Sequence, residues 1–527
     1  MAAQAEARVR SSQLPGERAW TTPALALLLA LPFLLRLGAA PLFDVDEGAF
    51  SEATREMLAS GDWGFTTLNG AVRFDKPILV YWLQAACVWL LGVNEAAFRL
   101  PLALCAWAWC LATVHFSAPR LGRPAAWLAG AVAATSLGVL VIGRAATADG
   151  LLNLLLALAL FDAWRHLENG AMAPLRRAYA WIGLGLLAKG PVAVLVPGAT
   201  VLLYCLFSGR PKAAWRAFSD ARGWALLLVI ALPWYAYALH RHGQAFVDGF
   251  FIRHNLARYG SVLEGHSGSV LYYLLVLPLL LLPWSALLVP LVARLRALWA
   301  LPLPRFLLLW AGFVLVFFSF SGTKLPHYAL YGATPLFMLI ADTARQRPRR
   351  AAWLVLPVAA LVAVLAGLLP ELMAHTAAQV GDPLYRALID GADAIDARTL
   401  HAGLAAALLA GALIAWQCRS PLLRSALCAG VLALLLTAAA SPWLGEVLQG
   451  PVREAGALAR GGQPAVQWGV HQPSFGVYRG QPTPRLGQQA PLPPGALALA
   501  REDRLPAQPG LRVVWRQRGF VLVLAER

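Results

Sequence analysis

Long apolar segments dominate the hydrophobic pattern of the chain, and short polar segments separate them. Apolar runs recur between residues 22 and 439, and a helix of about 20 apolar residues crosses a bilayer core of about 30 Å. We therefore predict an α-helical polytopic membrane protein with about thirteen transmembrane helices. The predicted spans are 22–38, 97–116, 124–142, 148–165, 178–189, 190–208, 223–240, 269–291, 305–321, 328–342, 351–369, 400–416 and 421–439.

The apolar run 77–93 has two interpretations, a further span or a helix that lies along the membrane surface. Counting it as a span would invert every later loop. With 77–93 on the outer face, the inner segments hold 21 Lys and Arg residues and the outer loops before residue 440 hold 11. Because basic residues concentrate in cytoplasmic loops, this pattern predicts an outer-face juxtamembrane helix at 77–93 and a periplasmic C-terminus.

Two further changes of pattern mark turns and a boundary. The run 178–208 is too long for one span, and Lys189-Gly190-Pro191 at its centre predicts a hairpin of two helices. After residue 440, Pro, Gly and Gln become frequent, and alternating patterns appear at 466–470, 511–516 and 520–525. Gln517-Arg518-Gly519 predicts a hairpin between the last two. We expect a transmembrane domain at 1–440, with an active-site loop at 39–96, and a small extracytoplasmic α/β domain at 441–527.

The composition agrees with a membrane protein and argues against a nucleic-acid-binding protein. The 527 residues are 59% hydrophobic and only 13% charged, whereas soluble domains carry about 25% charged residues. The net charge of +17 is explained by the basic inner loops, so we expect no nucleic-acid partner. The six cysteines lie in or beside apolar segments without metal-type spacing, which favours small core side chains over disulfides or metal ligands.

The predicted topology collects most scattered polar residues on the outer side. Ionisable groups at membrane depth are costly, so several of them on one face indicate a functional site. Each also has a structural alternative: acids after a span are often only solvated, lysines at helix ends often extend to the interface, and histidines more often satisfy local hydrogen bonds than bind metal. The collected residues are Asp44, Asp46, Glu47, Asp75, Lys76, Asp149, Lys189, His254, His266, Lys324, His327 and Tyr328.

A series of motifs follows in order over about residues 40–340. The motifs are Asp46-Glu-Gly-Ala-Phe-Ser-Glu52, Arg55-Glu-Met-Leu-Ala-Ser-Gly-Asp-Trp63, Leu68-Asn-Gly70, Phe74-Asp-Lys-Pro77, Tyr81-Trp82, Gly92-Val-Asn94, Arg99-Leu-Pro101, Asp149, Ala188-Lys-Gly190, Pro233-Trp234, Pro283-Trp284 and Lys324-Leu-Pro-His-Tyr328. This series resembles the bacterial 4-amino-4-deoxy-L-arabinose lipid A transferases, and the C-terminal third of the chain is similar to them only in architecture. That family belongs to the C-type glycosyltransferase superfamily, together with the protein O-mannosyltransferases.

The resemblance implies an undecaprenyl-phosphate-linked sugar donor, an outer-face site and inversion at the anomeric carbon. By position, Asp46 would be the catalytic carboxylate, Lys76 would hold the lipid phosphate, and Asp75 would replace a glutamate that contacts a divalent metal ion. The chain departs from the family in having Asp75, which is one methylene shorter, and Ala49 where an arginine is common. The full prediction is catalytic Asp46, Glu47 and Asp149; donor-binding Lys76, Lys189, Lys324, His327, Tyr328 and Tyr81; and metal-binding Asp75, His254 and His266.

Elementary chemistry supports the same assignment. A sugar hydroxyl is a poor nucleophile near neutral pH, so a carboxylate must take or share its proton. The departing phosphate gains negative charge, which lysines, the Tyr328 hydroxyl or a divalent cation would stabilise. We therefore predict an inner-membrane glycosyltransferase that moves a sugar from a polyprenyl phosphate to a cell-envelope acceptor such as lipid A. A protein O-mannosyltransferase-like enzyme and a lipid-linked sugar transporter or flippase are the alternatives.

Overall fold

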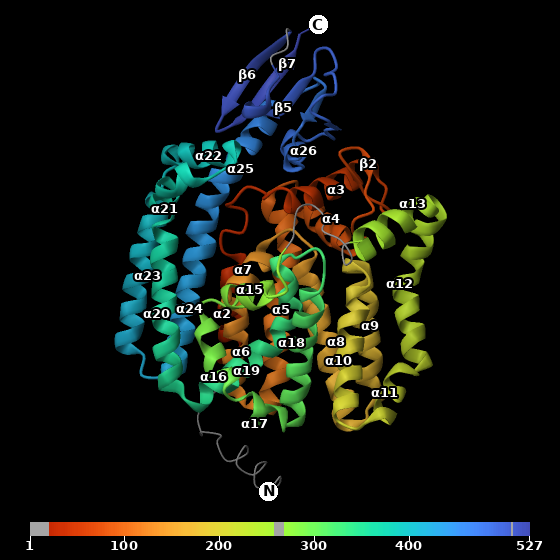
Figure 1. Cartoon of the computed structure of the whole chain (residues 1–527), viewed down its shortest axis with the longest axis vertical. Helices are drawn as coiled ribbons and strands as arrows, with labels where there is room; N and C mark the ends of the chain where they lie inside the picture. Colours follow the sequence, from red (N-terminus) through yellow and green to blue (C-terminus); the bar gives the residue numbers. More distant parts are fainter. Residues whose placement is uncertain (1–20, 258–267, 507–509, 527) are drawn as a thin grey trace.

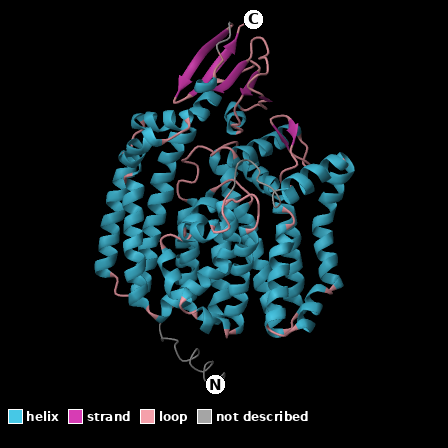
Figure 2. Cartoon of the chain, in the orientation of Figure 1, coloured by secondary structure: helices cyan, strands magenta, loops and turns pink. Residues whose placement is uncertain are grey.

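The chain forms a long helical bundle with a small β-sheet at one end. The computed structural model describes residues 21–257, 268–506 and 510–526. The long helices run side by side along the long axis, and the strands gather beyond one end of them (Figures 1 and 2). We call this the sheet end, and we call the end that carries α11 and α17 the far end.

The bounds of the elements follow. The helices are α2 (Thr21–Leu34), α3 (Asp46–Ser60), α4 (Leu79–Leu91), α5 (Glu95–Leu121), α6 (Arg123–Thr135), α7 (Leu137–Arg144), α8 (Asp149–Asn169), α9 (Met172–Lys189), α10 (Val192–Phe207), α11 (Pro211–Phe218), α12 (Ala221–His242), α13 (Gln244–Phe246), η1 (Val247–Ala257), α15 (Tyr272–Leu280), η2 (Trp284–Leu287), α16 (Leu288–Val292), α17 (Leu295–Trp299), α18 (Pro302–Ser319), η3 (Pro326–Gly332), α19 (Ala333–Gln346), α20 (Pro348–Gly367), α21 (Leu369–Thr376), η4 (Ala377–Gln379), α22 (Pro383–Asp390), η5 (Gly391–Ala394), α23 (Arg398–Gln417), α24 (Pro421–Leu435), η6 (Leu436–Ala440), α25 (Ser441–Leu458), α26 (Ser474–Arg479) and η7 (Glu502–Arg504). The strands are β1 (Thr67–Leu68), β2 (Ala71–Val72), β3 (Ala465–Trp468), β4 (Arg485–Leu486), β5 (Leu497–Arg501), β6 (Leu511–Gln517) and β7 (Phe520–Ala525).

The long apolar helices make this a chain suited to a membrane. Within the described ranges, seven helices are long and apolar enough to cross one, and nine qualify if each of two bent pairs counts as one span. The chain bends by 64° between α6 and α7, and by 117° between α15 and the helix that begins at Trp284. The prediction of a mostly α-helical chain with several membrane-capable helices is confirmed, whereas the count of thirteen stays a prediction.

The helices α3 and α4 lie across the ends of the long helices at the sheet end (Figure 1). Helix α4 has 13 residues, which at a rise of about 1.5 Å per residue is too short for a bilayer core of about 30 Å. Its outer residues Trp89 and Leu90 are 78% and 71% exposed. A short helix with exposed apolar side chains is typical of the membrane surface, which agrees with the interpretation of 77–93 as juxtamembrane.

Two predicted turns are confirmed. Helix α9 ends at Lys189 and α10 begins at Val192, with Gly190 in a left-handed conformation (φ +93°) that suits a residue without a Cβ atom. At the C-terminus, β6 and β7 pair antiparallel around Arg518 and Gly519.

The C-terminal strands form a mixed five-stranded sheet in the order β4-β3-β5-β7-β6. Its strands β3, β4 and β5 are parallel, and β5, β7 and β6 are antiparallel. The sheet follows α25, which continues α24 and η6 without a break from Pro421 to Leu458. The boundary predicted between residues 440 and 441 therefore falls inside a helix, and the division into two domains stays a prediction.

Buried aromatic side chains fix the segment that carries Tyr331. The Trp310 indole donates a hydrogen bond to the Tyr331 carbonyl at 2.7 Å, and the Trp109 indole donates to Thr334 Oγ1 at 2.8 Å. Both tryptophans are fully buried, so each indole N–H has the partner that burial demands. These bonds hold η3 and the start of α19 against the bundle.

Candidate active site

Most of the predicted site residues within the described ranges meet at the sheet end of the bundle. They come from the start of α3, the loop before α4, the start of α8, the end of α9, and η3. Most lie on or near helix ends, where unpaired backbone groups favour charged side chains. Two clusters of charged groups result, one around Asp75 and one around Asp149, with Asp46 as the nearest acid outside them.

Glu47 is fully engaged in holding the first turn of α3. Its carboxylate accepts hydrogen bonds from Arg99 Nε at 2.9 Å and Nη2 at 2.7 Å, from the Phe43 amide at 2.9 Å, and from the Ala146 amide at 2.7 Å. Burial alone would raise its pKa, but Arg99 and the two amides lower the pKa of Glu47 below its ordinary value. A carboxylate with four donors is suited to positioning its neighbour Asp46.

Asp46 itself is exposed at the first position of α3. Among the described residues, no hydrogen bond or ion pair occupies its carboxylate. Its charge acts electrostatically on Arg73 and His327, which places it beside both clusters. A carboxylate that faces open space next to Arg73 has the arrangement that a general base requires.

The first cluster surrounds Asp75. Its carboxylate oxygens lie 2.8 Å from Lys76 Nζ, 2.8 Å from Arg73 Nη2 and 3.0 Å from His254 Nδ1. Burial alone would raise its pKa, but Lys76, Arg73 and His254 hold the pKa of Asp75 well below its usual range. One carboxylate thus faces two permanent cations and an imidazole, so the cluster carries excess positive charge. Such a group is suited to receive an anion.

The second cluster surrounds Asp149, the first residue of α8. Its Oδ1 lies 2.5 Å from Lys189 Nζ, 2.7 Å from the Tyr331 hydroxyl and 3.7 Å from His327 Nε2. Lys189 ends α9, so each charge sits at the helix terminus that favours it. The Lys189 ammonium also lies 5.5 Å from the ring centres of Tyr328 and Tyr331, a distance at which cation–π attraction acts.

His327 lies between the two clusters. Its pKa is lowered to about 4: burial is the largest cause, Lys189 and Lys76 also lower it, and Asp149 and Asp46 oppose them. The imidazole is therefore neutral near pH 7. Asp149 and Lys189 of the second cluster, Lys76 of the first cluster, and Asp46 all act on this ring, so the two clusters and Asp46 lie near one another.

The remaining predicted residues have other surroundings. Tyr81 is buried, its ring stacks on Phe50 at 5.5 Å, and its hydroxyl lies beside Arg73. Lys324 is buried too, and its ammonium donates to the Ser321 carbonyl at 2.6 Å within its own loop. His266 lies outside the described residues.

Three residues of the site were not predicted: Arg73, Arg99 and Tyr331. Tyr331 follows Tyr328 by three residues in the 3₁₀ helix η3, where positions three apart share a face. The sequence predicts an ordinary α-helical span from residue 328, so the spacing of three residues did not indicate that the two tyrosines share a face. Arg73 precedes Asp75 by two residues, and Arg99 was quoted only as part of a motif. The signal for Arg73 was its position beside a candidate acid, whereas Arg99 is 52 residues from Glu47 and had no such signal.

The described residues offer an incomplete set of metal ligands. Among them, no group of three or more His, Cys, Asp or Glu side chains is placed to hold a metal ion. Asp75 and His254 are together, as predicted, but both Asp75 oxygens already face cations. A divalent ion there would have to displace Lys76 or Arg73, so these residues as arranged do not fit one.

Comparisons with known proteins find similar proteins under two descriptions, a protein mannosyltransferase and an arabinosyl transferase. A family described as dolichyl-phosphate-mannose-protein mannosyltransferase matches residues 75–237. An undecaprenyl phosphate-alpha-4-amino-4-deoxy-L-arabinose arabinosyl transferase of Shewanella sediminis is 29% identical over 326 residues, which is 60% of this chain and 58% of that protein. A relative of the same description from Sodalis glossinidius is 33% identical over 332 residues, or 61% of this chain and 58% of that protein. The chain thus spans about three fifths of the curated relatives it matches.

The fold agrees over a larger part of the chain. A crystal structure of ArnT from Cupriavidus metallidurans bound to undecaprenyl phosphate superposes with a TM-score of 0.82 at 24% identity, and covers 96% of this chain and 98% of that one. The apo form of that protein gives a TM-score of 0.81. The resemblance inferred from the sequence is therefore confirmed: the chain is similar to the 4-amino-4-deoxy-L-arabinose transferases in sequence and has the fold of one of them.

Proposed function

We propose that this chain is an inverting glycosyltransferase that moves a sugar from a polyprenyl (undecaprenyl) phosphate donor to a cell-envelope acceptor such as lipid A. The curated relatives are named for such a transfer, and the structure of similar fold holds undecaprenyl phosphate. The observation that carries the proposal is the excess positive charge around Asp75, beside the exposed Asp46. It provides a place for a phosphate and a base for the attacking hydroxyl on one surface.

In the proposed mechanism, Asp46 accepts the proton of the acceptor hydroxyl as the hydroxyl oxygen attacks the anomeric carbon. The bond between that carbon and the phosphate oxygen breaks, and the electron pair leaves with the polyprenyl phosphate. Lys76 and Arg73 stabilise the negative charge that grows on the phosphate. Attack opposite to the leaving group inverts the anomeric carbon.

The Asp149 cluster would position other side chains of the site and would not take part in the reaction itself. Lys189, the Tyr331 hydroxyl and His327 converge on Asp149 Oδ1. The Asp149 side chain is also only 8% exposed, which leaves little of that carboxylate open to a substrate. The cluster would fix His327 and the rings of Tyr328 and Tyr331 as one wall of the donor site. We propose the same supporting role for Glu47. The predicted metal ion enters no step of this mechanism.

We also propose that the sheet end faces the periplasm and the far end faces the cytoplasm. Helix α11 and the segment before α17 lie at the far end (Figure 1), and they carry Lys212, Arg216 and Arg294. Basic residues at one end agree with the positive-inside distribution. This orientation, with thirteen spans in the inner membrane, would put Asp46 and the C-terminus outside the cytoplasm.

The decisive test replaces Asp46 with asparagine. Asp46→Asn keeps the size of the side chain and removes the base, so transfer from a polyprenyl-phosphate sugar should fall by about 10²- to 10⁴-fold. The matched control is Asp62→Asn, because Asp62 is a half-exposed acid near the other end of α3 that pairs with Arg241 at 2.7 Å. Transfer is measured in proteoliposomes, and thermal unfolding in detergent checks that both variants are folded. Full activity in Asp46→Asn would remove the catalytic assignment.

A protein acceptor is the second candidate, because the matching family is described as a protein mannosyltransferase. Mass spectrometry of the envelope with and without the chain separates the two. A mass added to glycolipids supports the first proposal, and a hexose added to proteins supports the second.

A further inference from the structure

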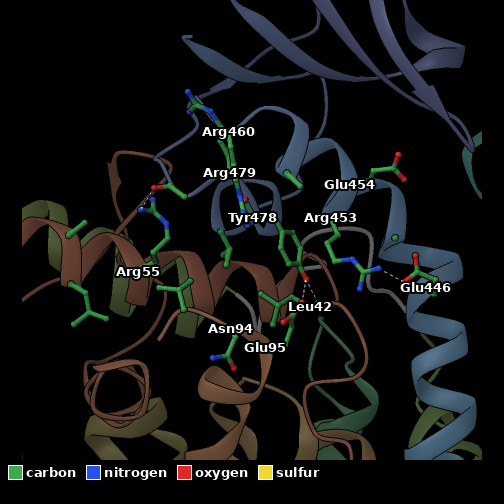
Figure 3. Close-up of a pocket in the computed structure, with 17 residues that line it drawn as sticks. Leu42, Arg55, Asn94, Glu95, Glu446, Arg453, Glu454, Arg460, Tyr478 and Arg479 are labelled. Carbon is green, nitrogen blue, oxygen red and sulfur yellow. Dashed lines mark hydrogen bonds and ion pairs between the residues drawn. The ribbon is translucent and has the colours of Figure 1, made fainter. Parts of the chain in front are cut away.

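The short helix α26 contacts the segment that carries Asp46, although about 430 residues separate them in the chain. Asp44 accepts hydrogen bonds from the Ser474 amide at 3.0 Å and from the Ser474 hydroxyl. The Leu42 amide donates to the Tyr478 hydroxyl oxygen at 2.7 Å, and this hydroxyl donates to Glu95 at 3.1 Å (Figure 3). These contacts hold the positions two and four residues before Asp46.

The same helix also contacts α3 beyond Asp46. Arg55 donates to the Gly480 carbonyl at 3.1 Å and forms a bidentate ion pair with Glu52. A Cβ atom at Gly476 would overlap the Glu52 carboxylate, and one at Gly48 would overlap Asp44 and the Ser474 amide. Glycine is therefore required on both helices for this close approach.

The contact of α26 with the start of the chain has an apolar part and a polar part. All six residues of α26 are buried, and Val477 and Tyr478 share a buried apolar cluster with Leu42. A groove of about 1040 Å³ lies beside it, between α3, α25 and α26, and Arg55 and Arg479 are among its lining residues (Figure 3). The apolar contacts hold α26 in place, and the hydrogen bonds of Ser474 and Tyr478 fix the backbone at residues 42 and 44.

The orientation of the Asp46 carboxylate depends on the backbone that carries it. Among the described residues, its carboxylate has no side-chain partner to orient it, so the segment from Leu42 to Glu47 must do so. The bundle holds this segment through Arg99, which binds Glu47 and the carbonyls of Ala40 and Pro41. The C-terminal part holds it through α26.

We propose that α26 is a positioning element for catalysis, in which Ser474 and Tyr478 fix the backbone before α3 and so direct the Asp46 carboxylate. The inference rests on the proposed function of Asp46 as the base. It gives the C-terminal part of the chain a role in the reaction, which the motifs between residues 40 and 340 do not indicate. Ser474 and Tyr478 need not contact either substrate.

The test compares Ser474→Ala and Tyr478→Phe with wild type in the full-length chain. Ser474→Ala removes the hydroxyl donor to Asp44 and keeps the amide, and Tyr478→Phe removes the acceptor of the Leu42 amide. Since displacement of a reacting group by about 1 Å costs up to about 10²-fold, we expect kcat to fall roughly ten- to a hundredfold. The KM for the donor should stay within about twofold, because the Asp75 cluster is untouched. Hydrogen exchange of residues 42–50 should become faster in both variants.

The control is Gln488→Ala. Gln488 donates to the Arg504 carbonyl at 2.8 Å in the C-terminal part, so its loss weakens that part without altering the bonds of α26 to residues 42 and 44. We expect its kcat and the exchange of 42–50 to match wild type.

Three outcomes overturn the proposal: unchanged exchange at 42–50 in both variants, a loss of activity that lies entirely in KM, or an equal loss of kcat in the control. If wild type itself transfers no sugar, the proposed function fails, and the exchange measurement alone then decides whether α26 fixes this segment.

Discussion

The Asp75 and Asp149 clusters contain the same kinds of group, but their charges balance differently. Each has a carboxylate, a lysine and a histidine. Asp75 faces Lys76 and Arg73 together with His254, whereas Asp149 faces one lysine, a tyrosine hydroxyl and a histidine that is neutral near pH 7. The first cluster therefore has excess positive charge and the second is balanced.

The cluster with excess positive charge is also the more exposed of the two. The Asp75 side chain is 25% exposed and sits in the loop before α4, and the Asp149 side chain is 8% exposed where the start of α8 meets the end of α9. A balanced pair is the form in which charges tolerate burial, and an unbalanced group at the surface is the form that attracts a ligand of opposite charge. The comparison teaches that similar residues serve structure in one place and donor binding in the other.

The largest effect should follow from breaking the balanced pair. Lys189→Met leaves the buried Asp149 carboxylate without its cation, and removal of one partner of a buried pair costs about 3–5 kcal/mol. We expect a large fall of the unfolding temperature in detergent, and loss of activity with it. Lys212→Met is the control, because Lys212 is exposed on α11.

The double variant Lys189→Met with Asp149→Asn sharpens this test. It removes both charges, so it should recover much of the lost stability. If Lys189→Met is as stable as Lys212→Met, the Asp149 cluster is not the balanced structural pair described above.

The unbalanced cluster should respond in the opposite way. Lys76→Met removes one of two cations that face Asp75, and Arg73 still pairs with the carboxylate at 2.8 Å. We expect little change of the unfolding temperature, but a rise of the donor KM and a fall of kcat, together about 10²-fold in kcat/KM. Steady-state kinetics with a polyprenyl-phosphate sugar measure both. A variant that unfolds as readily as Lys189→Met, with normal kinetics when folded, would reverse the comparison.

The sequence predicts these clusters only in part, because local patterns reveal helices and turns but do not reveal contacts between residues that are far apart in the chain. The helices, the turn at Lys189–Pro191 and the hairpin at Arg518–Gly519 were predicted because apolar period and turn residues are local signals. The collection of ionisable groups on one face followed from topology, since charges avoid the bilayer core. The roles assigned to single residues stay predictions.

Other features have a weak local signal or none. The 117° bend after α15 lies within a run predicted as one continuous span, in which Pro278 and Pro283 indicate a break. Tyr331 enters the site because η3 is a 3₁₀ helix within a segment whose pattern suggests an α-helix. Ser474 contacts Asp44 across 430 residues, and a single serine in a polar segment has no periodic pattern to reveal such a partner. Long-range contacts between small polar residues are thus the part that pattern analysis misses.

The last prediction concerns His327, which lies between the clusters. Its folded pKa of about 4 is below the ordinary value of 6.5, so between these values the unfolded chain binds the proton and the folded chain does not. Lowering the pH from 6.5 to 4 should therefore destabilise the fold, by at most about 1.4 kcal/mol per pH unit. His327→Gln, which is neutral at every pH, should remove this part of the pH dependence and leave the shape of the activity profile between pH 6.5 and 8 unchanged. Unfolding temperatures at several pH values, with wild type beside the variant, measure the slope. A slope that stays the same in His327→Gln would mean that the ring is already charged in the fold, and the Asp149 cluster would then share the excess positive charge of its neighbour.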